Sequence, residues 1–255
     1  MKKLIAALAA TLALTACSPP ASPATPAAPA ASTSTITVFA AASLQTAFTK
    51  IGKGFTAEHP NAKVTFSFNG SSSLVDQLKG GAPADVFASA DEANMTKATD
   101  AALMSGTPRI FATNVLTLVV EPGNPKKITG LDASLDGAKL VVCANGVPCG
   151  NATAKLASQL GVTLKPVSEE QKVTDVLGKV TSGEADAGVV YTTDATGAGD
   201  KVTAVPISGS GDVVNRYPIA VTASSKQAAL AGQFTDYVMS AKGQEILTSF
   251  GFGKP

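Results

Sequence analysis

The sequence of 255 residues contains no tryptophan, a single histidine and only two arginines. Without tryptophan, and with only three tyrosines, the chain has few of the aromatic surfaces on which sugars usually stack. The lone histidine, His59, leaves little from which to build a metal site or a histidine-dependent catalytic site. Arg109 and Arg216 both lie outside the polar turns described below, which argues against an arginine clamp for an amino-acid carboxylate.

An excess of charge of either sign is also missing, because 20 lysines and arginines face 19 aspartates and glutamates. A nucleic-acid-binding protein needs a basic surface and an acidic tail needs a run of carboxylates, so neither class is predicted. Loss of the two lysines of the leader described next changes the formal net charge from +1 to −1. The exported chain therefore has no overall positive field with which to attract an anion.

Residues 1–16 place two lysines before a short apolar run, an order that is typical of a secretory signal peptide. The apolar run is too short to span a bilayer. Residues 14–17, Leu-Thr-Ala-Cys, resemble a bacterial lipobox, so we expect Cys17 to carry a lipid such as palmitate that anchors the chain to the cell membrane. The alternative is a plain secreted protein with a chance cysteine. We expect residues 17–34, which are rich in Pro, Ala and Ser, to form a disordered tether.

Cys143 and Cys149 are the remaining cysteines, and a pair of cysteines in an exported chain predicts a disulfide. A loop this short contributes about 2 kcal/mol in the chain-entropy model, so the main effect of the bond is to fix the local loop shape. Two free buried thiols are the alternative.

Short β-branched runs alternate with helical patterns from residue 35 to the end of the chain. The expected strands are residues 35–40, 62–68, 85–88, 115–120, 139–142, 187–191 and 217–222. This alternation predicts an α/β protein with mainly parallel sheets. In such sheets, ligands bind where the strands end and the helices begin.

Four polar strand-to-helix turns are candidate binding sites: the turns around Ser43, which we expect to be an N-cap, around Ser71, around Cys149 and around residues 171–173. Ordinary helix capping explains any one of them alone, but their joint occurrence favours a binding site. A helix start carries unpaired N–H groups and about half a positive charge, so several converging starts hold an anion without a cationic side chain. A small inorganic oxyanion fits this inventory best.

Three consecutive serines, residues 71–73, raise the alternative of a serine-dependent hydrolase. A serine nucleophile needs a base, and His59 lies in a polar stretch where a solvated side chain is expected. No Gly-x-Ser-x-Gly motif surrounds these serines, and the sequence contains no nucleotide-binding loop. The chain is therefore not expected to be an enzyme, to use a cofactor or to hold a free metal cation.

Five segments, taken in order, closely resemble the periplasmic molybdate-binding proteins of ABC importers. They are ITVFAAASL (36–44), GAPADVFASA (81–90), VPCG (147–150), GVVY (188–191) and YPIAV (217–221). The resemblance implies a type II periplasmic-binding-protein fold, in which two α/β lobes joined by crossing strands close on a ligand cleft. Lobe 1 would comprise residues 35–116 and 219–255, and lobe 2 residues 117–218. The hinge strands would lie near residues 116–119 and 218–221.

The same resemblance implies the residues that hold the oxyanion. They are Ser43 and Ser71 through their hydroxyl groups, Cys149 and Val173 through their backbone N–H groups, and Tyr191 through its phenol; Ser72 is the alternative to Ser71, and Ala42 is an additional candidate. The implied ligand is molybdate or tungstate, so that molybdenum is bound only as the oxyanion. A binding protein for sulfate or phosphate is the alternative. The implied partners are a molybdate ABC permease and its cytoplasmic ATPase, and we expect an extracytoplasmic monomer that binds no nucleic acid.

Overall fold

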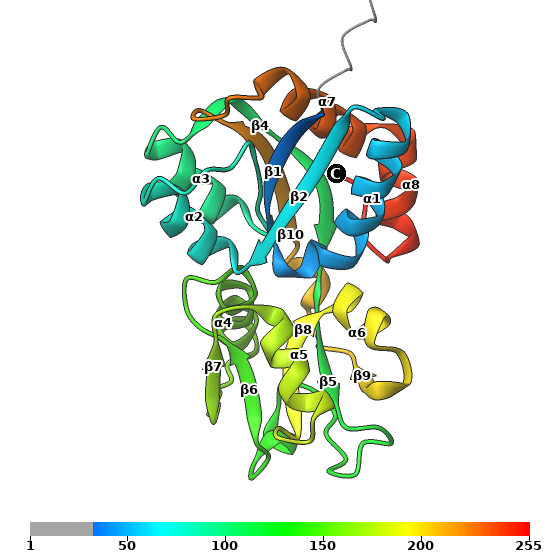
Figure 1. Cartoon of the computed structure of the whole chain (residues 1–255). Helices are drawn as coiled ribbons and strands as arrows, with labels where there is room; N and C mark the ends of the chain where they lie inside the picture. The colour runs from blue at the N-terminus through cyan, green and yellow to red at the C-terminus, as the bar shows by residue number, and fades with distance from the viewer. Residues whose placement is uncertain (1–32) are drawn as a thin grey trace, which may run out of the picture. The chain divides into compact units, whose positions relative to one another are not determined.

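The computed structural model describes residues 33–255 (Figure 1). The predicted signal peptide, the predicted lipidation site Cys17 and residues 17–32 of the predicted tether lie outside the described residues. Strand β1 begins at Ser34, so regular structure starts at the last residue of the expected tether. Within residues 33–255, no helix combines the length and the apolar character needed to cross a membrane.

The first of two sheets has five strands in the order β2-β1-β3-β10-β4. The bounds of these strands are Ser34–Ala41 for β1, Ala62–Asn69 for β2, Val86–Ala88 for β3, Met104–Asn114 for β4 and Asn215–Thr222 for β10. Strand β1 is parallel to both β2 and β3, whereas β10 is antiparallel to both β3 and β4. The carboxyl ends of β1, β2 and β3 therefore meet at one edge of the sheet.

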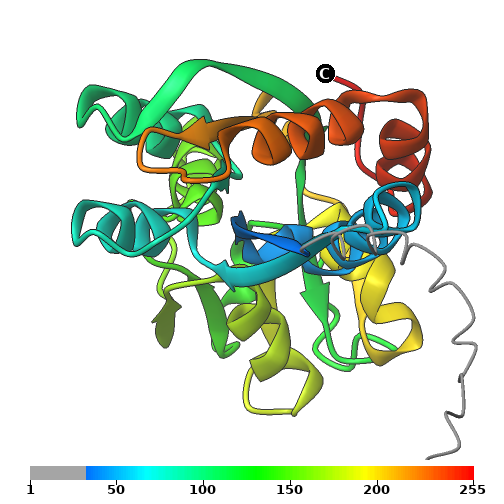
Figure 2. The same cartoon turned by 45° about the horizontal axis from the view of Figure 1, so that its top comes forward.

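Helices cover both faces of this sheet (Figure 2). Their bounds are Gln45–Glu58 for α1, Ser71–Lys79 for α2, Glu92–Asp100 for α3, Ala228–Met239 for α7 and Ala241–Ser249 for α8, with a short 3-10 turn, η1, at Ala42–Leu44. On one face, Phe48 and Phe55 of α1 pack edge to face against Phe234 of α7. On the other face, Leu74 of α2 and Met95 of α3 belong to a second apolar cluster.

The second sheet also has five strands, in the order β7-β6-β8-β5-β9. The strands are β5 Leu116–Val120, β6 Leu140–Cys143, β7 Ser168–Glu170, β8 Ala187–Tyr191 and β9 Thr203–Val205; the helices are α4 Pro148–Leu160, α5 Val173–Thr181 and α6 Thr192–Ala198, with 3-10 turns η2 Ala133–Leu135, η3 Gly199–Lys201 and η4 Ser210–Asp212. A separate buried cluster of mostly Val, Leu and Ala forms the core of this lobe. The two sheets thus have their own cores, as the two-lobed α/β prediction requires.

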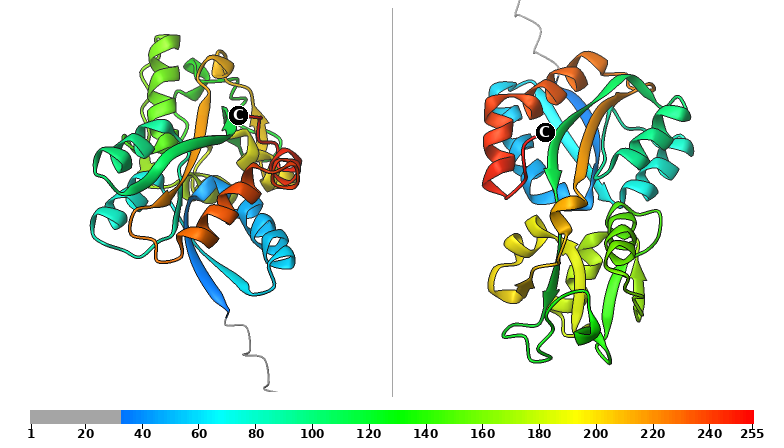
Figure 3. Two further views of the ribbon diagram at one scale, coloured as in Figure 1. Left: turned by 90° about the horizontal axis from the view of Figure 1, so that it is seen from above. Right: turned by 180° about the vertical axis from the view of Figure 1, so that it is seen from behind.

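The chain passes between the two sheets twice (Figure 3). Strand β4 ends at Asn114 and β5 of the other sheet begins at Leu116. On the return, β9 ends at Val205 and β10 begins at Asn215. Asn114 and Asn215 are paired in register at the end of the β4–β10 ladder. These two asparagines therefore mark the crossing on the side of the first sheet.

The pairing of the strands and the extent of two of them differ from what the sequence pattern predicted. In the described residues, four of the eight strand pairs are antiparallel, so the prediction of mainly parallel sheets was wrong. The second hinge strand, which we expected near residues 218–221, corresponds to β10, whose pairing with β4 begins at Asn215. Its role as a hinge stays a prediction. Asn215 and Arg216 are polar, so the apolar pattern revealed this strand only from Tyr217. Strand β4 was missed because Gly106, Pro108 and Arg109 interrupt its pattern.

Candidate functional site

A small cavity between the two lobes brings together residues that are far apart in the sequence. It is lined by Ala41, Ala42, Ser43, Gly70, Ser71 and Ala90 from the first lobe and by Val147, Pro148, Cys149, Lys172, Val173 and Tyr191 from the second. All five predicted binding residues and Ala42 are in this set, whereas Ser72 is not. The volume of this cavity is about 10 Å³, which is room for one compact group.

The cavity walls are the starts of helices. Ser71 is the first residue of α2, Cys149 is the second residue of α4, and Val173 is the first residue of α5. No side chain caps the N-terminus of any of these three helices. By comparison, α3 is capped by Asp91 and α8 by Ser240. Uncapped helix starts leave backbone N–H groups available for a ligand, and the helix dipole favours a negative charge there.

Ser71 is almost fully buried, and the direction of its hydroxyl is fixed by a neighbouring peptide group. The N–H of Ala90 donates to Ser71 Oγ at 3.0 Å. Because this bond occupies the oxygen as an acceptor, the serine proton remains to be donated into the cavity. The Ser71 hydroxyl is thus able to donate a hydrogen bond at the cavity.

Ser43 is not the N-cap that we expected, because it lies inside the 3-10 turn η1 and makes no capping bond. Its Oγ lies 3.1 Å from the hydroxyl of Tyr217, a fully buried residue of β10. The amide of Asn114 donates to that same Tyr217 hydroxyl at 3.4 Å. Strand β1 leads directly into η1, and the contact with Tyr217, rather than a capping bond, positions the Ser43 side chain.

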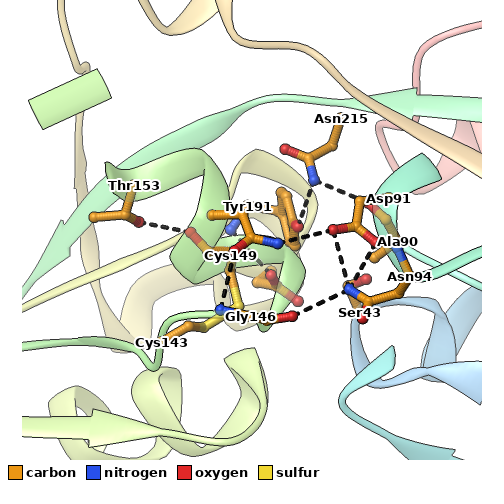
Figure 4. Close-up of a disulfide and its surroundings, with 12 residues drawn as sticks. Ser43, Ala90, Asp91, Asn94, Cys143, Gly146, Cys149, Thr153, Tyr191 and Asn215 are labelled. Carbon is orange, nitrogen blue, oxygen red and sulfur yellow. Dashed lines mark hydrogen bonds between the residues drawn. A yellow bond between two sulfur atoms is a disulfide. The ribbon is translucent and has the colours of Figure 1, made fainter. Parts of the chain in front are cut away.

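Tyr191 ends strand β8 and is 1% exposed, so its phenol reaches the cavity from inside the protein. The Nδ2 atom of Asn215 donates to the Tyr191 hydroxyl at 3.0 Å (Figure 4). Burial raises the pKa of the Tyr191 phenol well above its usual value, and it also raises the pKa of Tyr217. Both phenols therefore keep their protons at neutral pH.

The predicted disulfide joins Cys143 at the end of β6 to Cys149 in the first turn of α4. Two hydrogen bonds tie its loop and α4 to the first lobe (Figure 4). Asn94 Nδ2 donates to the Gly146 carbonyl at 3.2 Å, and Asn151 Nδ2 donates to Asp91 Oδ2 at 3.2 Å. The loop that carries Cys149 is therefore fixed both by a covalent bond and by contacts across the cleft.

Lys172 is one of the cavity-lining residues that were not predicted from the sequence. Lys172 is the N-cap residue of α5, next to the predicted Val173, and its ammonium lies 3.5 Å from Asp175. The sequence pattern had marked the turn at residues 171–173, and this was the signal from which Lys172 could have been predicted. Asn114, Asn215 and Tyr217 were also missed, and no local pattern marks them. No carboxylate is among the cavity-lining residues.

The residues of the hydrolase alternative do not come together. His59 stacks on Phe55 at 4.3 Å between ring centres and lines a separate surface pocket with Glu58 and Leu230. Ser71 has no histidine partner among its hydrogen bonds, and its oxygen is occupied by the Ala90 N–H. Within residues 33–255, no cluster of three or more His, Cys, Asp or Glu side chains is suited to hold a metal ion.

The sequence profile of the bacterial extracellular solute-binding protein family matches residues 36–253. The chain belongs to this family. This solute-binding protein is 51% identical to the molybdate-binding protein ModA of Mycobacterium tuberculosis over 222 residues, covering 87% of the chain and 85% of that relative. It is 34% identical to the molybdate-binding protein ModA of Escherichia coli, covering 85% of the chain and 88% of that relative.

Among solved structures, the periplasmic molybdate-binding protein of Azotobacter vinelandii has a similar fold, with a TM-score of 0.76 at 22% identity. The match covers 86% of this solute-binding protein and 99% of the Azotobacter chain. The two-lobed periplasmic-binding-protein fold is thereby confirmed. Family membership also makes the chain an extracytoplasmic binding protein of a transport system rather than an enzyme.

Proposed function

We propose that this solute-binding protein captures molybdate between its lobes and delivers it to an ABC importer. The observation that carries the proposal is the cavity in which Ser43, Ser71 and Tyr191 meet three uncapped helix starts. The identity of 51% to a molybdate-binding protein supports the choice of ligand. Ser43, Ser71 and Tyr191 would donate their hydroxyl protons, and Ala42, Cys149 and Val173 would offer backbone N–H groups.

The donor character of the cavity favours a fully deprotonated tetrahedral oxyanion. Such a dianion offers only acceptors, and each hydrogen bond to an ionised acceptor contributes about 1.5–3 kcal/mol. At neutral pH phosphate still carries a proton, which needs an acceptor of its own. Because no carboxylate lines the cavity, that proton would be left without a partner. We therefore expect phosphate to be rejected.

Tungstate has the same charge as molybdate and nearly the same size, so we expect it to bind as well. Sulfate is the second candidate ligand, because a site made of donors accepts its four oxygens equally well. Sulfate is smaller than molybdate, so its rejection would rest on the distances between the two lobes.

Lobe closure is the step that links binding to transport. An oxyanion that bridges Ser71 of the first lobe and Cys149 of the second contacts both lobes only in the closed form, so it shifts the population toward that form. We propose that the closed protein then docks as a monomer on a molybdate permease, whose cytoplasmic ATPase hydrolyses ATP. A lipid on Cys17 would keep the protein at the outer face of the cell membrane.

Isothermal titration calorimetry of the unlipidated chain with molybdate, tungstate, sulfate and phosphate tests the proposed ligand. We expect binding of molybdate and tungstate, weaker binding of sulfate and no heat with phosphate. Phosphate or sulfate binding in the absence of molybdate binding would contradict the proposal. A Ser43→Ala variant is the matched comparison, because it removes one donor at the cavity and leaves all three helix starts in place.

A further inference from the structure

We propose that Asn114 and Asn215, the pair at the crossing between the lobes, are positioning residues that set the direction of the hydroxyl protons in the cavity. The proposal rests on the proposed function, since it concerns how the same site presents donors to an oxyanion. Neither asparagine lines the cavity. Each acts on it through a tyrosine hydroxyl, Asn114 through Tyr217 and Asn215 through Tyr191.

The two asparagines occupy equivalent places in the fold. Asn114 is the last residue of β4 and Asn215 is the first residue of β10, and the two are opposite each other in the ladder. They are 4% and 6% exposed, so their amides must find hydrogen-bond partners inside the protein. The partners of Asn114 include Thr192 and Thr193 of the second lobe, and those of Asn215 include Tyr191 of the second lobe.

The orientation of the Asn114 amide is fixed by a backbone donor. Its Oδ1 accepts from the N–H of Val115 at 3.0 Å and from Thr192 Oγ1 at 3.0 Å. A backbone N–H only donates, so the oxygen must face it and the NH₂ must face the other way. That NH₂ donates to Thr193 Oγ1 at 2.8 Å and to the hydroxyl of Tyr217.

The orientation of the Asn215 amide is fixed by a backbone acceptor. Its Nδ2 donates to the carbonyl oxygen of Ala90 at 2.9 Å, and a carbonyl oxygen only accepts. The same Nδ2 carries the second proton, which reaches the Tyr191 hydroxyl at 3.0 Å (Figure 4). In both cases the tyrosine oxygen is the acceptor, and the amide cannot be reversed without losing a backbone partner.

A phenol oxygen that already accepts a proton has its own proton left to give. Tyr217 and Ser43 Oγ lie 3.1 Å apart, and either hydroxyl can be the donor in this contact. In the proposal the Asn114 bond makes Tyr217 the donor, which leaves the serine proton for the cavity. The Tyr191 proton is then given to the oxyanion directly, because Tyr191 lines the cavity. Ser71 follows the same rule through the Ala90 N–H. In the proposal, the hydroxyl oxygens of Ser43, Ser71 and Tyr191 thus each accept a hydrogen bond from the protein and keep their own proton for the cavity. This arrangement matches an oxyanion, which offers only acceptors.

A merely structural role is the competing explanation, because both amides also join the two lobes. Asn94 provides the matched control, since it is fully buried and its Nδ2 bridges the lobes to the Gly146 carbonyl without touching a hydroxyl of the cavity. Asn94→Ala removes this bridge together with the bonds from Nδ2 to Asp91, but it removes no hydrogen bond to a hydroxyl of the cavity. Loss of the Asn215 amide changes both closure and the direction of the Tyr191 proton.

The experiment is a double-mutant cycle on molybdate affinity, measured by calorimetry, with Asn215→Ala and Asn94→Ala each made in the wild-type and in the Tyr191→Phe chain. We expect Asn215→Ala to weaken binding roughly tenfold in the wild type but less than about twofold in Tyr191→Phe. Asn94→Ala should weaken binding by the same factor in both backgrounds. Equal factors for Asn215→Ala in the two backgrounds would overturn the proposal.

A second cycle, Asn114→Ala with Ser43→Ala, keeps the test decisive if Asn215→Ala does not fold. Here the loss caused by Asn114→Ala should largely disappear once the Ser43 hydroxyl is absent. Equal losses with and without that hydroxyl would overturn the role of Asn114. If the wild-type chain binds no molybdate, the proposed function itself fails. If the wild-type chain binds molybdate but the losses in the double variants are additive, only the proposed role of the asparagines fails.

Discussion

At the residue scale, a hydroxyl group contributes to this site only in one direction, as a donor. The Ala90 N–H donates to Ser71 Oγ at 3.0 Å, and the Tyr217 hydroxyl lies 3.1 Å from Ser43 Oγ. Ser72 has no such arrangement and does not line the cavity. Both serines lie in the first turn of α2, but only Ser71 lines the cavity. This difference in orientation favours Ser71, a choice that the sequence left open.

Ser71→Ala should weaken molybdate binding roughly 10–100-fold, because one hydrogen bond to an ionised acceptor contributes about 1.5–3 kcal/mol. Ser72→Ala, on the same turn of α2, should change the affinity by less than about twofold. Calorimetric titration of both variants makes the comparison. A larger loss in Ser72→Ala than in Ser71→Ala would assign the second hydroxyl donor to Ser72.

Asp194 lies next to the site and gives the protein a dependence on pH. Burial raises the pKa of its carboxyl group to about 7, and the hydrogen bond from the Tyr191 N–H, at 3.1 Å, opposes this shift only in part. Between about pH 4 and pH 7 the folded chain therefore holds a proton that the unfolded chain has released. The free energy of unfolding should fall as the pH rises through this window.

Asp194→Asn removes this titration while keeping an acceptor for the Tyr191 N–H. Urea unfolding of the wild type and the variant at several pH values between 4 and 8 measures the effect. We expect the wild type to lose more stability than the variant as the pH rises. Parallel pH profiles of the two proteins would show that the Asp194 pKa is not raised by folding.

At the element scale, the function depends on how closely the helix starts of the two lobes approach each other. Gly70, the N-cap of α2, faces the carbonyl oxygen of Gln171 in the second lobe, and a Cβ built on Gly70 would overlap that oxygen. Glycine is required here by close approach and not by its backbone angles, since its φ of −58° suits any residue.

Gly70→Ala should therefore weaken molybdate binding at least tenfold by holding the lobes apart, with little change in the stability of the chain. Gly80→Ala at the other end of α2 is the matched control, because a Cβ there would meet its nearest atom only at 3.4 Å. Calorimetry gives the affinity and urea unfolding gives the stability. Wild-type affinity in Gly70→Ala would show that the closed lobes do not approach as described.

At the scale of the whole molecule, hydrogen bonds between buried polar groups join the two lobes. The buried Asp91 accepts from Asn94 within its own lobe and from Asn151 of the other lobe. Contacts of this kind are replaced by water when the lobes separate, so their net contribution to closure is small. The bound oxyanion, which contacts both lobes, is then the main factor that decides between open and closed protein.

The lipid anchor also belongs to this scale. In a host that processes bacterial lipoproteins, the full chain should be recovered in the membrane fraction, and Cys17→Ser should be recovered in the soluble extracytoplasmic fraction. Mass spectrometry of the N-terminal peptide checks the acylation directly. Membrane recovery of Cys17→Ser equal to that of the wild type would contradict anchoring through Cys17.

The sequence predicted most of the strands and the four turns because both depend on local patterns. Apolar periodicity predicted β1 and β2 to within one residue at each end. Serines at the expected helix starts marked the turns of Ser43 and Ser71. It did not predict β4, whose pattern is interrupted, or the antiparallel pairing of β10, which depends on residues about a hundred positions away. The N-cap role of Ser43 failed for the same reason, since Tyr217 decides its position.

By itself, the sequence determined the chemical inventory of the site: hydroxyls and helix starts, without arginine, tryptophan or a usable histidine. That inventory already excluded most enzymes and most sugar sites, because those activities require particular side chains. Only the tertiary structure decided which group faces each hydroxyl oxygen of the cavity: the Ala90 N–H at Ser71, the Tyr217 hydroxyl at Ser43 and the Asn215 amide at Tyr191. A hydrogen bond between residues far apart in the chain has no local signature, so its partners become visible only when the chain is folded.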